Sequence, residues 1–119
     1  MFRAAAVLAL SVLAVPVQAR PVEGTLTYLA RVALPAGAEV VIEARGLQDT
    51  LLAETRFQTG GKQVPLSFAM TLPDGVRATL RAAVVVDGQP LWVSDAMTVT
   101  AGDAPVRLGE VVLHSFQPM

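Results

Sequence analysis

Apolar and polar residues alternate with a period of two along most of the chain, in short runs separated by Gly and Pro. The clearest run covers residues 63–72, where one face carries only apolar side chains: Val64, Leu66, Phe68, Met70 and Leu72. Such alternation is typical of half-buried β-strands. Glycine or proline recurs about every ten residues, which leaves room for few helices of ordinary length. The pattern therefore predicts an all-β protein.

Seven runs are predicted as strands: 25–34, 39–45, 51–59, 63–72, 76–86, 91–100 with a break near Asp95, and 105–113. Gly60-Gly61 and Asp87-Gly88 have the sequences of two-residue hairpin turns. For residues 47–59 the sequence allows either a strand or a short helix, because Asp49 is a suitable N-terminal cap for a helix. Short strands joined by turns predict a single antiparallel β-sandwich of about seven strands, with a small barrel as the related alternative.

The first 19 residues follow a different pattern. Arg3 precedes an apolar run over residues 4–15, and Val17-Gln18-Ala19 has the small-x-small form of a cleavage site. This arrangement is typical of a secretory signal peptide, and the run is short for a membrane span. We therefore expect cleavage after Ala19, a domain over residues 20–119 whose last residues, 115–119, form a loose tail, and a periplasmic or secreted protein without a stable membrane anchor. A retained N-terminal anchor is the alternative.

Composition and charge make several chemistries improbable. Nucleic-acid-binding proteins carry clustered positive charge, whereas the net charge of this chain is −1. The chain has no cysteine, so it forms no disulfide and no thiolate metal site. His114 is the only histidine, and Ser67 and Ser94 lack the Gly-x-Ser-x-Gly context of a hydrolase nucleophile. Glu39 and Glu43 would stand about 13 Å apart on a strand, too far for a glycosidase pair. The sequence predicts no enzyme, metal or cofactor; a carboxylate-dependent hydrolase and a small-molecule or lipid carrier remain alternatives.

Trp92 is the candidate partner-binding residue. It is the only tryptophan and follows the turn at 87–90. Packing in the core is its ordinary role, whereas an exposed tryptophan is typical of a binding hot spot. The outward arginines are expected to pair with glutamates on neighbouring strands, the residues concerned being Arg31, Arg45, Arg56, Arg77 and Arg81 with Glu39, Glu43 and Glu54.

Several segments in this order resemble the YbaY/YscW-like family of small bacterial envelope proteins: residues 24–31, 34–38, 40–46, 64–68, 80–82 and 91–95. The resemblance covers about residues 23–113 and implies a β-sandwich in the bacterial envelope. Some members of this family are pilotins, lipoproteins that bind the C-terminal tail of an outer-membrane secretin and help it to assemble. This chain departs from them because it has no cysteine to carry a lipid. No binding motif carries over residue by residue.

We therefore expect a non-enzymatic, exported protein that binds or helps to assemble another envelope protein, with a secretin-like component as the candidate partner. It would be pilotin-like without being lipidated. An exposed strand edge or an apolar groove between sheets is the expected binding mode. The sequence alone identifies neither the partner nor the oligomeric state.

Overall fold

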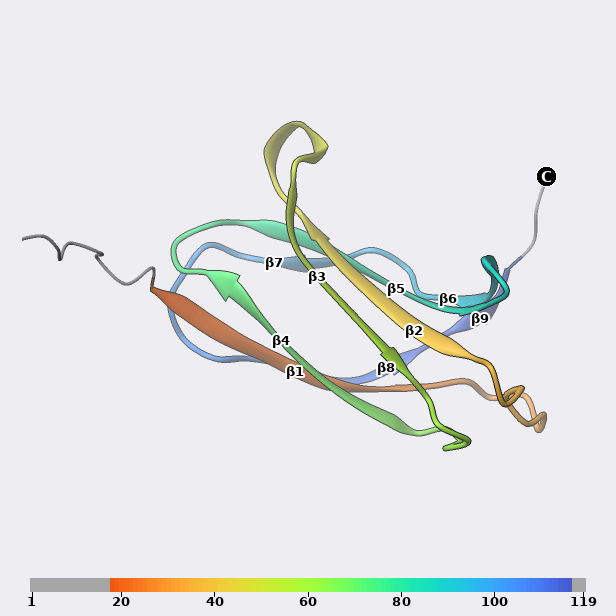
Figure 1. The fold of residues 1–119 in the computed structure, drawn as a ribbon. Helices are drawn as coiled ribbons and strands as arrows, with labels where there is room; N and C mark the ends of the chain where they lie inside the picture. The colour runs from red at the N-terminus through yellow and green to blue at the C-terminus, as the bar shows by residue number, and fades with distance from the viewer. Residues whose placement is uncertain (1–17, 117–119) are drawn as a thin grey trace, which may run out of the picture.

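The computed structural model describes residues 18–116, which form two β-sheets packed face to face (Figure 1). The smaller sheet has the strand order β4-β1-β8, and the larger has the order β3-β2-β5-β6-β9 with β7 also beside β5. The strands are β1 Ala19–Thr27, β2 Glu39–Arg45, β3 Leu51–Gln58, β4 Leu66–Pro73, β5 Ala78–Val86, β6 Gln89–Val93, β7 Met97–Val99, β8 Val106–Val112 and β9 His114–Ser115. The expected all-β fold with two packed sheets is confirmed.

Helical structure in residues 18–116 is limited to one 3₁₀ turn, η1 (Leu47–Asp49), directly before β3. Within the ambiguous segment 47–59, the strand predicted over 51–59 is therefore confirmed as β3, whereas residues 47–49 form the helical turn. Within the described range, no helix has the length and apolar character needed to cross a membrane. The hairpin that η1 closes, between β2 and β3, projects beyond the two layers (Figure 1).

The predicted break near Asp95 divides one run into β6 and β7, which both pair with β5. At the break, the backbone N–H of Ser94 donates to the carbonyl of Ala82, and its Oγ accepts from the Ala82 N–H, each at 2.9 Å. The serine hydroxyl thus takes the place of a ladder carbonyl. One expectation about pairing was wrong, because β1 and β8 run parallel rather than antiparallel.

The first strand was also misplaced. It covers Ala19–Thr27 rather than 25–34. Arg20 occupies an inward position and is only 6% exposed, because its guanidinium donates at 2.9 Å to the carbonyls of Ala104 and Thr100. A charged residue at a core position conceals the alternation at the start of the strand. Beyond Tyr28 the chain leaves the sheet, and the apolar Leu29 is 84% exposed.

Two further expectations need correction. Gly60 and Gly61 have positive φ angles as expected, but they do not close a hairpin, because β3 and β4 belong to different sheets. The predicted loose tail begins too early: Ser115 pairs with Trp92 in β9, and the N–H of Phe116 donates to the carbonyl of Leu91. The hairpin at Asp87-Gly88 is confirmed between β5 and β6. Residues 1–17, which hold most of the predicted signal peptide, and 117–119 lie outside the described residues.

The core lies between the inward faces of the two sheets. The smaller sheet contributes residues such as Leu26 and Leu72, and the larger contributes Ile42 and Leu80, all almost completely buried. Burying an aliphatic side chain of this size stabilises a fold by about 1.5–3 kcal/mol. The sequence contains no cysteine, so packing of these faces has to stabilise the domain without disulfides.

Candidate functional site

Trp92 lies half-buried on β6, with its side chain packed against the core. Its ring stacks on that of Tyr28, with the centroids 4.1 Å apart and the planes 10° apart. The Tyr28 hydroxyl donates to the carbonyl of Val32 at 2.6 Å, and burial raises the pKa of Tyr28. This geometry favours a packing role for Trp92. A partner-binding role for its remaining exposed surface stays a prediction.

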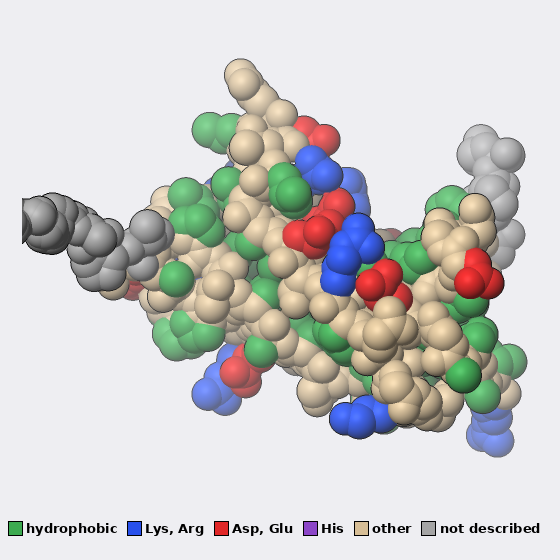
Figure 2. All heavy atoms as spheres, viewed as in Figure 1, with side chains coloured by type: hydrophobic (Ala, Val, Ile, Leu, Met, Phe, Trp, Pro, Cys, Tyr) green, Lys and Arg blue, Asp and Glu red, His purple; other side chains and the backbone are tan. Residues whose placement is uncertain are grey.

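The outward faces of β2 and β3 carry paired charges, visible as adjacent acidic and basic side chains in Figure 2. Arg56 contacts Glu39 on the neighbouring strand at 3.5 Å and Glu54 on its own strand at 3.3 Å. Arg45 contacts Glu43 at 3.2 Å. Hydrogen bonds to Glu54 and Glu43, respectively, raise the pKa of Arg56 and of Arg45. Arg56 with Glu39 is a cross-strand pair of the predicted kind, whereas the other two pairs form within a strand.

The residues considered for catalysis have other partners. His114 contacts the Asp95 carboxylate at 3.2 Å on the surface, and the Ser94 hydroxyl bonds to Ala82. Ser67 lies on β4, in the other sheet. The described residues also contain no group of three or more His, Asp or Glu side chains able to hold a metal ion.

The two sheets differ in width, and residues 59–65 join an edge strand of the larger sheet to an edge strand of the smaller one. Of the two edge strands in each sheet, β3 of the larger sheet and β4 of the smaller one follow each other along the chain. The inward residues of β2 are completely buried, whereas Ala53, Thr55 and Phe57 of β3 are only half-buried. We call the two edges and the connecting residues 59–65 the open side. The partial burial of its inward side chains indicates that the smaller sheet does not fully cover β3.

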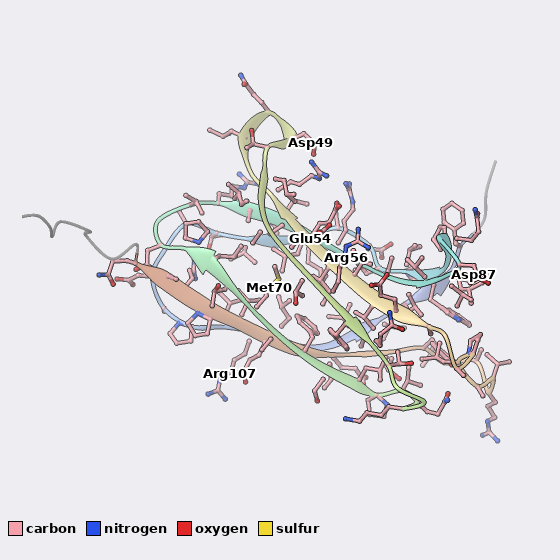
Figure 3. The ribbon with its side chains drawn as sticks, viewed as in Figure 1. Asp49, Glu54, Arg56, Met70, Asp87 and Arg107 are labelled. Carbon is pink, nitrogen blue, oxygen red and sulfur yellow. The ribbon has the colours of Figure 1, made fainter. Side chains whose placement is uncertain are left out.

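The free edge of β4 has no charged side chain. Its outward residues are Ser67, Ala69 and Thr71, and Figure 3 shows Met70 pointing from β4 toward the larger sheet. The N–H of Asp74 donates to the carbonyl of Gln18 at the end of the ladder between β1 and β4. Because hydrogen-bonded pairs alternate in an antiparallel ladder, the backbone groups of Ser67, Ala69 and Thr71 point to the free edge.

Exposed edges in natural sheets are usually protected by charges, bulges or covering segments. The β4 edge has no charge along the strand itself. This strand therefore presents unpaired backbone donors and acceptors next to small, neutral side chains, which is the requirement for adding another strand.

A surface hollow of about 710 Å³ lies where β3 ends and β4 begins, and its lining includes Phe57, Thr59, Lys62 and Leu66. Thr59 is only 2% exposed, and its Oγ1 has no hydrogen-bond partner among the described residues. The hollow therefore has a mixed lining, in which the apolar Phe57 and Leu66 stand beside polar side chains such as Lys62.

Sequence reasoning proposed an exposed edge or a groove but did not place it. The uncharged alternation of residues 66–73 was visible in the sequence. That β4 lies at an edge beside an incompletely covered β3 depends on the order of strands in both sheets.

One solved structure shares this fold, and one family model matches the sequence. The chain is similar to the solved structure of an alternative pilotin from the type II secretion system of Vibrio cholerae, with a TM-score of 0.68 and 24% identity over 83% of this chain and 100% of that chain. At this identity the likeness concerns the fold. No curated protein matches the sequence. The model of the YscW family, described as type III secretion system lipoprotein chaperone, matches residues 17–108, and the chain therefore belongs to the YscW family.

Proposed function

We propose that this protein is an exported, non-enzymatic chaperone that binds an extended segment of another envelope protein on its open side. A secretin-like outer-membrane component is the proposed client. Membership of the YscW family supports an envelope role, and the structural neighbour is itself a pilotin. The observation that carries the proposal is the uncharged, unpaired β4 edge beside the half-covered inward face of β3.

The geometry defines what the client segment looks like. Its backbone bonds to the free groups of Ser67, Ala69 and Thr71, so it is an extended strand that adds to the smaller sheet. Alternate side chains of that strand face the larger sheet, where they meet Ala53 and Phe57 of β3. The preferred segment therefore alternates apolar with polar or small residues and lacks proline at the bonding positions.

Lipid attachment does not enter this mechanism. The family is described as a lipoprotein chaperone, but this sequence contains no cysteine for a thioether-linked lipid. We therefore propose that the protein acts in the periplasm without a lipid anchor of its own. It would cover an apolar, aggregation-prone strand of the client until the client assembles, because an uncovered strand edge pairs readily with other chains.

The test measures binding of labelled peptides from the C-terminal region of the secretin made by the same organism. Ala69→Pro removes an edge N–H without removing a donor to β1, whereas Ala69→Thr keeps the N–H and has high strand propensity. We expect fluorescence anisotropy to show binding to the wild type and to Ala69→Thr, with affinity reduced about tenfold or more in Ala69→Pro.

Thermal unfolding of both variants shows whether the fold is retained. Failure of the wild-type protein to bind any of these peptides would contradict the proposed client. Equal affinities of folded Ala69→Pro and Ala69→Thr would contradict strand addition at β4.

A further inference from the structure

We propose that the free edge of β3 is an interface for a second copy of this chain, with the two β3 strands pairing antiparallel about a two-fold axis at Thr55. This interface uses the backbone edge of β3, whereas the proposed client strand bonds to the backbone edge of β4; the two contacts share the inward side chains Ala53 and Phe57. Three features of β3 support this pairing: its free backbone groups, the positions of two opposite charges, and its half-buried inward face.

The free backbone groups follow from the ladder between β2 and β3. The N–H of Thr59 donates to the carbonyl of Ala38 at 3.1 Å, just beyond the register pair Glu39 with Gln58. Hydrogen-bonded pairs alternate along such a ladder, so Ala53, Thr55 and Phe57 also bond to β2. The backbone groups of the residues between and beside them face the open edge: Glu54, Arg56 and Gln58; Leu52 is the extra residue of a β-bulge, where this alternation ends.

Charge selects one register for self-pairing. When Thr55 lies opposite its own copy, Glu54 lies opposite Arg56 of the second copy, and the same contact recurs on the other side of the axis. Both members of this pair have free backbone groups, so the pair also exchanges backbone hydrogen bonds. Figure 3 shows that Glu54 and Arg56 follow one another along β3 on the charged outer face.

Other registers of the same pairing are unfavourable. A shift by two residues brings Glu54 opposite its own copy in one direction and Arg56 opposite its own copy in the other, and like charges in directly opposed positions are destabilising. A shift by one residue moves every side chain to the wrong face of the sheet. Edge charges usually prevent pairing, but on β3 the adjacent opposite charges are self-complementary in one register.

The inward side chains fit the same arrangement. Ala53 would lie opposite Phe57 of the second copy, and Thr55 opposite itself, which extends the larger sheet across both copies. All three side chains are half-buried in the single chain. Pairing removes part of their remaining surface from water, which adds an apolar contribution to the backbone hydrogen bonds.

Charge reversal tests the register. In the exported protein, Glu54→Arg alone and Arg56→Glu alone each place like charges opposite one another at two symmetric positions. We expect sedimentation equilibrium to show a wild-type dimer, an approximately 10- to 100-fold weaker dimer for each single variant, and recovery of wild-type affinity in the double variant Glu54→Arg/Arg56→Glu. A wild type that stays monomeric at high concentration, or a double variant no better than the single variants, would overturn the proposal.

A disulfide tests the axis. Two directly opposed residues of a non-hydrogen-bonded pair have Cα atoms about 4.5 Å apart, within disulfide range. The sequence has no cysteine, so Thr55→Cys introduces a single thiol per chain. With oxidised glutathione as oxidant, we expect Thr55→Cys to form covalent dimers much faster than Ala101→Cys, an exposed control in the loop before β8. Equal rates for the two variants would contradict a two-fold axis at Thr55.

Discussion

The stacked rings of Tyr28 and Trp92 connect the segment after β1 to the larger sheet, and the free energy that this contact contributes to stability can be measured directly. Tyr28 is nearly fully buried and follows β1, whereas Trp92 belongs to β6 in the other sheet. We expect Tyr28→Leu and Trp92→Leu each to destabilise the fold, because each removes an aromatic surface that packs against the other.

The magnitude follows from burial and from ring geometry. Complete truncation of a buried aromatic residue costs about 3–5 kcal/mol, and leucine at the half-buried position 92 retains part of that packing. We therefore expect about 1–2 kcal/mol for Trp92→Leu and about 2–3 kcal/mol for Tyr28→Leu, which also loses the hydrogen bond to Val32. The 4.1 Å stack predicts a coupling free energy of about 0.5–1.5 kcal/mol between the two sites.

The assay is urea unfolding of the wild type, both single variants and the double variant, followed by far-ultraviolet circular dichroism, which reports the loss of β-sheet and remains usable in variants that lack the rings. The double variant should be less destabilised than the sum of the single variants, by the coupling free energy. Strict additivity of the two effects would refute a contribution from stacking. In the peptide-binding assay, folded Trp92→Leu should bind as the wild type does; loss of binding would favour the alternative role of Trp92 as a partner anchor.

Three other substitutions or titrations test separate parts of the structure. Tyr28 is the only tyrosine, and burial raises its pKa, so its tyrosinate absorbance should appear at a pH above the ordinary pKa of 10.0. The free energy of unfolding should decline as the pH rises from the pKa of Tyr28 in the unfolded chain toward its higher pKa in the folded protein. A titration midpoint of the folded protein at or below 10.0 would contradict this. Gly24→Ala should cost about 1–3 kcal/mol in urea unfolding, because its Cβ would lie 3.0 Å from the Gly109 carbonyl oxygen, whereas Gly37→Ala, with open space around it, should be nearly neutral. Arg20→Leu should cost about 2–3 kcal/mol, since two carbonyls lose a charged donor; a cost below 0.5 kcal/mol would show that these hydrogen bonds contribute little.

The strands with regular alternation were predictable because one face is buried along their whole length. Residues 39–45 were predicted as a strand with the bounds that β2 has, and its inward Val40, Ile42 and Ala44 are all completely buried. The first strand was not predictable in the same way. Arg20 takes a core position there, and the exposed Leu29 imitates a continuing pattern, so its limits depend on tertiary contacts.

The position of the open side could not be predicted from the sequence, because it also depends on tertiary structure. A pair such as Gly60-Gly61 indicates that the chain turns, and the positive φ angles confirm this, but the pair does not determine which strands become neighbours. Here the chain crosses to the other sheet, so β3 and β4 become two separate edges instead of a hairpin. The candidate site consists of those two edges, and periodicity along either strand does not reveal it.

The two proposed contacts on the open side should strengthen one another. Pairing β3 with its copy widens the larger sheet by a partner sheet, while the smaller sheet still ends at β4 in each copy. The inward side chains of both β3 strands, Ala53, Thr55 and Phe57, pack against the core of their own copy but would still be only partly covered by the smaller sheets. A client strand added to each β4 edge would extend the smaller sheet and cover these side chains of β3. Because coupling between binding events is reciprocal, saturating client peptide should tighten the dimer, and the Thr55→Cys cross-linked dimer should bind the peptide more tightly than the Glu54→Arg variant at a concentration where that variant is monomeric. Equal peptide affinities for these two forms would mean that the edges of β3 and β4 act independently.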